Sequence, residues 1–126
     1  MKNKLRTITI GNQPYVYRLS MHIMNGTCTS QLKVFAEDSK LHPLIIYIRT
    51  WDDPIAGCPL QTGFLLYNMA TGTESLYNLN HPQRVREWIE YGVINGWDGT
   101  QQIEILDGVA AMREMGYEMD KLLPLT

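Results

Sequence analysis

The chain has 126 residues, of which 44% are hydrophobic and 19% charged, and its formal net charge at pH 7 is −2. These values are typical of one globular domain that spans residues 1–126 and buries its own core. Because the charge is small and negative, and because no apolar run is long enough to cross a bilayer, we expect no nucleic-acid partner and no membrane partner.

The two cysteines are Cys28 and Cys58. Their spacing does not show whether they pair. The N-terminal sequence lacks the apolar core of a secretory signal, so we predict a cytoplasmic bacterial protein whose thiols are free.

The first part of the chain predicts a series of strands. Residues 5–10 alternate between apolar and polar side chains, which indicates a short edge strand, and residues 15–24 carry the clearest period-two pattern. Asn25-Gly26 is a pair that strongly favours a two-residue hairpin. We therefore expect residues 27–36 to fold back on the second strand.

A fourth strand is expected at residues 44–51, where both alternating positions are apolar in the first half. Such a strand is typical of a sheet that is covered on both faces. The next segment, residues 52–63, contains two prolines and two glycines and predicts a long loop, of a kind that often carries function. Residues 64–69 and 75–79 predict two further short strands.

The strongest signal is an amphipathic helix at residues 82–95. Pro82 is favourable in a first helical turn, and Gly96 favours the left-handed turn that ends a helix. Asn80 and His81 are the candidate N-caps, and Asn80 has the better side chain for this position. We expect the apolar arc of the helix to pack on the sheet, with a glycine allowing close approach. This arc consists of Val85, Trp88, Ile89, Gly92 and Val93.

The chain continues with a short strand at residues 102–106 and a helix at about residues 108–115, for which Asp107 is the expected N-cap. This order of elements predicts an α+β domain. We expect an antiparallel sheet of five to seven strands, with the main helix (about 82–95) and the short C-terminal helix (about 108–115) packed on one face.

One motif resembles that of a known group of proteins. The pattern Pro-x-x-Val-Arg-x-Trp-Ile-Glu-Tyr begins at Pro82, and Asn-Gly-Trp-Asp and a strand that ends near Asp107 follow it. Over residues 79–108 the chain is similar to small uncharacterised bacterial accessory-genome proteins of the gene-cassette or immunity type. The resemblance implies no catalytic residue. Such proteins usually have Thr or Ser before the proline, whereas this chain has His81, so we expect its cap chemistry to differ.

One candidate binding site lies where the apolar fourth strand ends. Trp51, Asp52 and Asp53 place an aromatic ring beside two carboxylates at the start of the long loop. Adjacent carboxylates can form an acid–base pair or bind a metal. Asp before Pro is also common in turns, and sequence neighbours usually point apart, so a turn is the simpler interpretation.

A second candidate binding site lies on one edge of the main helix. Arg84, Trp88 and Tyr91 share this edge, where a guanidinium can stack on a ring or the free N–H groups of the first turn can hold an anion. Pairing of Arg84 with a surface carboxylate is the more common arrangement.

The sequence contains no arrangement that indicates catalysis or metal binding. His22, His42 and His81 are far apart and lack a partner at ligand spacing, so we predict no metal site and no cofactor. A hydrolase would require Cys58 or one of the two aspartates of the loop to meet a histidine in space. We therefore lean against an enzyme.

These observations predict a small non-catalytic protein that acts through protein–protein interaction, as a homodimer or with another protein. The apolar strand at residues 44–51, Ile94 on the polar side of the helix and the apolar C-terminal tail support this interpretation. The alternative is a small-molecule-binding domain with a pocket between sheet and helix near the 52–63 loop.

Overall fold

The computed structural model describes residues 5–52 and 57–124. In chain order the elements are β1 (Arg6–Ile10), β2 (Gln13–Met24), β3 (Thr27–Ala36), β4 (Ser39–Trp51), α1 (Pro59–Thr62), β5 (Phe64–Asn68), β6 (Thr73–Tyr77), α2 (Pro82–Ile94), β7 (Ile103–Ile105), α3 (Gly108–Glu114) and the 3-10 helix η1 (Asp120–Leu122). The predicted α+β class is confirmed, and α2 and α3 lie where helices were predicted. The short helix α1 was not predicted, because it lies within the segment 52–63 that was expected to be a loop.

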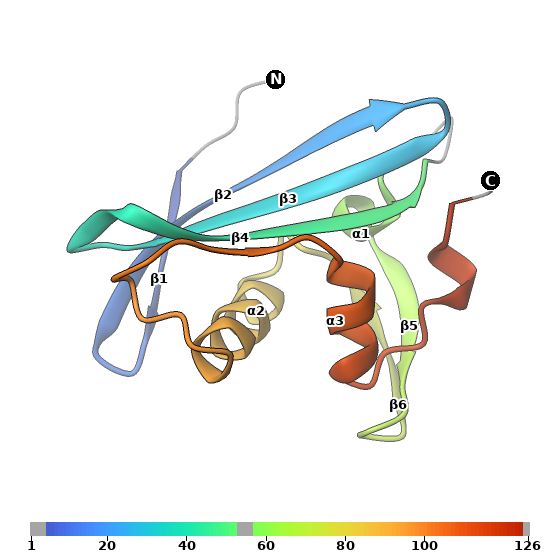
Figure 1. Cartoon of the computed structure of the whole chain (residues 1–126). Helices are drawn as coiled ribbons and strands as arrows, with labels where there is room; N and C mark the ends of the chain where they lie inside the picture. Colours follow the sequence, from blue (N-terminus) through green and yellow to red (C-terminus); the bar gives the residue numbers. More distant parts are fainter. Residues whose placement is uncertain (1–4, 53–56, 125–126) are drawn as a thin grey trace.

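Five strands form one mixed sheet in the order β1-β2-β3-β4-β7, and β5 and β6 form a separate antiparallel pair (Figure 1). β1 to β4 are antiparallel neighbours, whereas β7 runs parallel to β4, with Leu44 beside Ile103. The prediction of a purely antiparallel sheet is therefore wrong. The reason is that α2 lies between β4 and β7 in the sequence and returns the chain to the end of the sheet where β4 begins, which permits parallel pairing.

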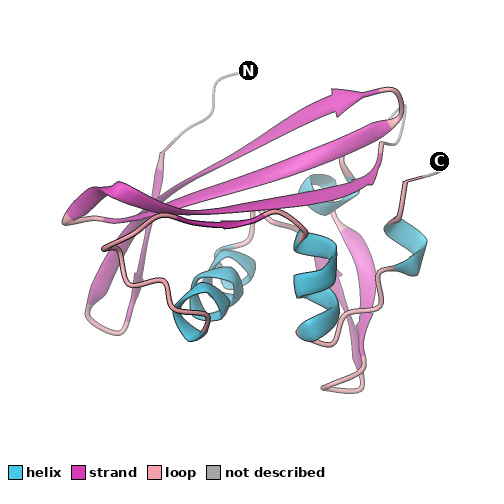
Figure 2. Cartoon of the chain, viewed as in Figure 1, coloured by secondary structure: helices cyan, strands magenta, loops and turns pink. Residues whose placement is uncertain are grey.

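The helices α2 and α3 pack against one face of the five-stranded sheet, as predicted, and the described helices leave its other face open (Figures 1 and 2). On the outer face, where we expect a loop or a partner to cover residues 44–51, the described residues place no helix. Ile45 points to that face and is nevertheless buried. Its cross-strand neighbours there are Lys33 and Glu104.

Helix α2 packs its apolar arc on the sheet. Val85, Trp88 and Ile89 are fully buried, as predicted, whereas Val93 is half-exposed because it lies near the end of the helix, beside a hollow described below. A Cβ atom on Gly92 would overlap the side chain of Leu44 on β4. The close approach predicted for this glycine is confirmed.

The two ends of α2 differ in how well the sequence predicts them. At the C-terminal end, Gly96 has a φ of 103° and the Trp97 N–H donates to the carbonyl of Gly92 (2.9 Å), which forms the predicted Schellman turn. At the N-terminal end, His81 is the N-cap, but its side chain makes no capping hydrogen bond. The Asn80 side chain instead donates to a backbone carbonyl of α1 (2.9 Å).

Other local predictions are confirmed. Asn25 and Gly26 have φ values of 53° and 78°, which is the backbone conformation of a type I′ hairpin turn between β2 and β3. The Asp107 carboxylate accepts a hydrogen bond from the N–H of Ala110 (3.0 Å) and caps α3. Part of the apolar C-terminal tail also docks on the body of the protein, since Leu122 is fully buried.

Cys28 and Cys58 form a disulfide bond, with their Cα atoms 5.6 Å apart. The prediction of free thiols is therefore wrong. The bond joins β3 to the residue that precedes α1, and both cysteines are fully buried. Their proximity depends on the packing of α1 under the sheet, which a spacing of 30 residues does not indicate.

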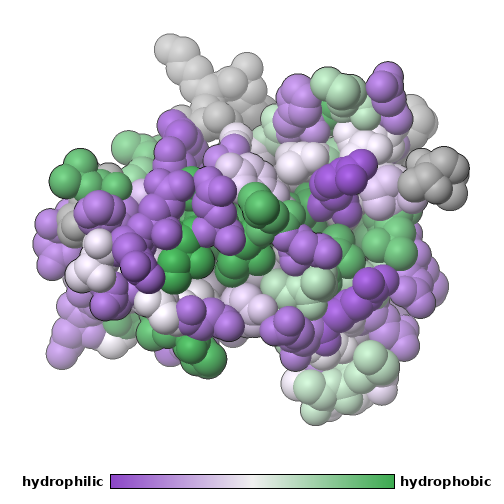
Figure 3. All heavy atoms as spheres, in the orientation of Figure 1, coloured by the Kyte–Doolittle hydropathy of each residue, from purple (hydrophilic) through white to green (hydrophobic). Residues whose placement is uncertain are grey.

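The surface alternates between polar and apolar regions. Figure 3 shows hydrophobic residues gathered in the middle of one face, with hydrophilic residues on both sides. Ile94, at the end of α2, is 83% exposed, so the chain after Gly96 does not cover it. Within the described residues, we find no helix that has both the length and the apolar character needed to cross a membrane.

Candidate functional site

The first candidate site is an unpaired stretch of β2. This strand has 12 residues, but β1 pairs only with its first five, from Gln13 to Tyr17. Beyond them, residues 18–24 have no neighbouring strand on the β1 side among the residues that the structure describes. We call this stretch the open edge.

A hydrogen bond at the other end of β2 shows which residues of the open edge direct their N–H and C=O groups away from β3. The N–H of Glu37, just after β3, donates to the carbonyl of Pro14 (3.1 Å), and the register between β2 and β3 has no shift. In an antiparallel pair, successive residues direct their N–H and C=O groups alternately toward the partner strand and away from it. Leu19, Met21 and Ile23 therefore direct theirs outward.

The side chains of the open edge are largely apolar. Met21 is 46% exposed, Ile23 48% and Met24 58%. Natural edge strands usually carry lysine, proline, a bulge or a cover that prevents pairing with another strand. Residues 19–24 have neither lysine nor proline, and the β2–β3 register shows no bulge. Apart from the charge of Arg18 at its start, the open edge therefore has none of the usual protection against strand pairing among the residues that the structure describes.

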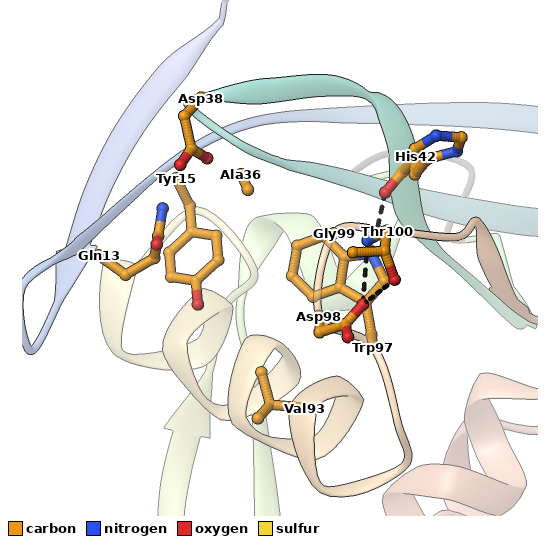
Figure 4. Close-up of a pocket in the computed structure, with 10 residues that line it drawn as sticks. All are labelled: Gln13, Tyr15, Ala36, Asp38, His42, Val93, Trp97, Asp98, Gly99 and Thr100. Atoms are coloured by element: carbon orange, nitrogen blue, oxygen red, sulfur yellow. Dashed lines mark hydrogen bonds between the residues drawn. The ribbon is translucent and has the colours of Figure 1, made fainter.

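The second candidate site is a hollow of about 680 Å³ at the end of the sheet that carries the β1–β2 and β3–β4 turns (Figure 4). We call it the end hollow. Its size is within the range of pockets that bind small molecules. It is lined by Gln13, Tyr15, Ala36, Asp38, His42, Val93, Trp97, Asp98, Gly99 and Thr100.

The part-exposed ring of Tyr15 forms the aromatic wall of the end hollow, and Trp97, which is only 1% exposed, packs behind it. The ring centroids of Tyr15 and Trp97 are 5.8 Å apart, and the Trp97 indole donates to the backbone carbonyl of His42 (3.0 Å). This bond fixes the indole, whereas the His42 ring lies on the side of its backbone away from Trp97 (Figure 4). Burial raises the pKa of the Tyr15 phenol, so this side chain is neutral at physiological pH.

Two carboxylates form the polar part of the end hollow. Asp98 accepts hydrogen bonds at Oδ1 from the Thr100 hydroxyl (2.5 Å) and backbone N–H (3.0 Å), and the hydroxyl bond is the main cause that lowers the Asp98 pKa. Asp38 extends from the β3–β4 turn on the side of Tyr15 (Figure 4). Both carboxylates are solvent-exposed.

No family model, curated protein or solved structure matches this chain. Its function is therefore inferred from the geometry of its own residues.

The residues expected on one edge of α2 are engaged within the protein. The guanidinium of Arg84 donates to Glu87 (3.0 Å), to the hydroxyl of Tyr117 (2.9 Å), and to Ser75 and a backbone carbonyl on β6 (both 2.9 Å). It stacks on the Tyr77 ring at 4.7 Å, and not on the two aromatic rings of its own helix edge. Arg84 thus links α2, β6 and the C-terminal segment.

The two aromatic residues of that edge also have internal partners. The fully buried Trp88 donates from its indole to the hydroxyl of Tyr77 (2.9 Å). Tyr91 donates to Glu114 on α3 (2.7 Å), and its ring contacts that of Trp88 edge-on at 5.8 Å. These contacts give Trp88 and Tyr91 a packing role in this structure.

The candidate site at the end of β4 is described only in part. The Trp51 ring packs against Phe64, and its indole donates to the carbonyl of Lys121 (2.6 Å). Oδ1 of Asp52 is buried and has no hydrogen-bond partner among the described residues. Asp53 lies outside the described residues. The pocket predicted near residues 52–63 differs from the end hollow, which lies at the opposite end of β4.

The residues of the end hollow were not predicted as a site. Tyr15 lies at the start of a predicted strand and Trp97 just after a predicted helix, and no local signal joins segments that are about 80 residues apart. Asp38 belongs to a polar turn, as most surface aspartates do. In the described part of the chain, no group of three or more His, Cys, Asp or Glu side chains is placed to hold a metal ion.

Proposed function

We propose that this protein acts through protein–protein interaction, and that it associates with a second copy of itself through the open edge of β2. The observation that carries the proposal is the unprotected run of outward-directed backbone groups from Leu19 to Ile23. In water each of these groups bonds to solvent, and pairing with another strand replaces those bonds and buries the apolar side chains beside them.

Two copies of the open edge are complementary when they pair antiparallel about a two-fold axis at Met21. In this register Met21 faces its own copy and Leu19 faces Ile23 of the second copy. All three residues direct their N–H and C=O groups outward, so the pairing forms about six backbone hydrogen bonds. A two-fold arrangement closes on itself and therefore gives a dimer rather than a fibre.

The side chains agree with this register. On the helix-bearing face, Leu19, Met21 and Ile23 form apolar cross-strand pairs only with one another. On the outer face, Arg18 lies opposite Met24 of the second copy, so no like charges are opposed. The two five-stranded sheets become one continuous sheet across the dimer.

Sedimentation analysis over a range of concentrations tests the proposal. We expect the wild-type chain to shift from monomer to dimer as concentration rises, and Met21→Lys to remain monomeric, because two lysines would face each other at the axis. The matched control is Ile94→Lys, which also replaces an exposed apolar side chain, and it should dimerise as the wild type does.

Amide hydrogen exchange tests the register independently. In the dimer the amides of Leu19, Met21 and Ile23 should become protected as concentration rises, while those of Ser20 and His22 are protected at every concentration by β3. A chain that stays monomeric at millimolar concentration contradicts the proposal. A dimer that Met21→Lys leaves intact shows that another surface is used.

The gene-cassette or immunity-type resemblance is compatible with this proposal, because it implies no catalytic residue. The resemblance is an inference from the sequence motif alone. A bacterial origin is part of the same proposal.

A second candidate function is the binding of a small molecule. The end hollow supports it, because its volume, its aromatic wall and its polar groups are those expected of a ligand pocket. In this proposal the pocket lies between the sheet and the C-terminal end of α2. The experiment in the next section tests it.

A further inference from the structure

We propose that the end hollow binds a small organic cation, such as a ligand with a quaternary or protonated amine. This inference rests on the second candidate function and names its ligand class. It is carried by the residues that line the hollow, which include two carboxylates and the part-exposed ring of Tyr15 but neither lysine nor arginine.

The charges around the end hollow favour a cation. Among the ten residues that line it, Asp38 and Asp98 are the only acidic ones, and neither lysine nor arginine is among them. Both hydrogen bonds from Thr100 go to Oδ1 of Asp98. The lowered pKa of Asp98 keeps this carboxylate ionised at neutral pH. An anion would lie beside two negative charges, with neither lysine nor arginine among the lining residues to compensate them.

The aromatic wall favours an organic cation over a hydrated metal ion. The Tyr15 ring is part-exposed in the hollow, and the face of an aromatic ring attracts a positive charge. Trp97 is only 1% exposed and packs behind Tyr15, with the ring centroids 5.8 Å apart, so it supports this ring and does not offer a face of its own. Apolar groups attached to a nitrogen gain from contact with the Tyr15 ring, whereas a metal ion requires several oxygen ligands that converge on one point. A volume of about 680 Å³ also exceeds what a single ion fills.

Two probes of nearly equal shape show whether binding requires a positive charge or only a ligand of that shape. Choline carries a trimethylammonium group, and 3,3-dimethylbutan-1-ol is its neutral isostere. We expect choline to shift the amide resonances of Tyr15, Trp97 and Thr100 in NMR titrations, with a dissociation constant about fivefold or more below that of the alcohol. Raising the salt concentration should weaken choline binding and leave the alcohol unaffected.

Matched variants show whether the carboxylates provide the selectivity. Asp38→Asn and Asp98→Asn should each weaken choline binding about threefold to fivefold without a change for the alcohol. Glu74→Asn, an exposed carboxylate on β6 away from the hollow, should leave both probes unaffected.

Each other outcome overturns the inference and identifies what failed. If the alcohol binds as well as choline, the end hollow is a ligand site but its ligand is not a cation. If acetate binds and choline does not, the electrostatic argument is wrong. If none of the three probes shifts these resonances at 50-fold molar excess or above, the small-molecule function fails as well, and the proposal of self-association is unaffected.

Discussion

At the scale of single residues, the Arg84 side chain makes polar contacts with two segments outside its own helix. Its guanidinium joins α2 to β6 through Ser75 and to the C-terminal segment through Tyr117. A planar fork with several donors is suited to such a position, and a lysine ammonium is not. A residue that the sequence suggests as a binding residue therefore holds three parts of the fold together.

Tyr117 provides a prediction on the dependence of stability on pH. Its hydroxyl donates to Glu87 (2.7 Å), and burial, followed by this bond, raises its pKa to about 12 from an ordinary value of 10.0. Because the folded-state pKa is raised, the stabilisation is fully present below pH 10 and is lost as the pH rises toward 12. Tyr117→Phe should therefore lower the free energy of unfolding at pH 7 by about 1 kcal/mol.

The same variant should lose stability less steeply than the wild type between pH 10 and 12, as measured by urea unfolding at several pH values. Burial also raises the pKa of Tyr77, and the resulting loss of stability at alkaline pH is common to both proteins. Equal slopes for the two proteins would show that the Tyr117 proton does not contribute to alkaline unfolding.

At the scale of elements, the contact between α2 and β4 sets how closely the helix approaches the sheet. Gly92→Ala should lower the free energy of unfolding by about 1 to 3 kcal/mol, because the new methyl group overlaps the Leu44 side chain. This loss outweighs the roughly 1 kcal/mol that alanine gains over glycine in a helix. Thermal or urea unfolding of the purified variant measures it.

A double-mutant cycle provides the control for this prediction. In a Leu44→Ala background the space beside Gly92 is open, so Gly92→Ala should there be neutral or stabilising. If Gly92→Ala destabilises both backgrounds equally, the overlap with Leu44 is not the cause.

Much of this fold is predictable from the sequence, because turns, helix ends and helix caps depend on only a few neighbouring residues. The turn at Asn25-Gly26, the end of α2 at Gly96 and the cap at Asp107 are all of this kind. The direction of β7, the pairing of Cys28 and the end hollow depend on contacts between segments far apart in the chain. Periodicity and residue preference contain no information on such contacts.

At the scale of the whole molecule, the disulfide bond fastens the segment before α1 to the sheet. Closing a loop of 30 residues stabilises a folded chain by about 3 to 4 kcal/mol in the chain-entropy model. We therefore expect dithiothreitol to lower the midpoint of urea unfolding, and the double variant Cys28→Ala with Cys58→Ala to show the same low midpoint with or without reductant.

An unchanged midpoint under reducing conditions would show that the bond adds nothing to stability. The bond also bears on the expected cytoplasmic location, because structural disulfides persist mainly in oxidising compartments. Mapping the thiols of the protein taken directly from cells, with a thiol-reactive reagent, determines which state occurs there.

The parallel pairing of β4 with β7 has a consequence for how the chain is made. Strands β1 to β4 follow one another in sequence and can assemble as soon as they leave the ribosome, whereas Leu44 meets Ile103 only after about sixty further residues have been synthesised. Until then the nascent sheet has an unpaired apolar strand edge at β4 as well as at β2. That interval is when a newly made chain is most prone to mispairing with its neighbours.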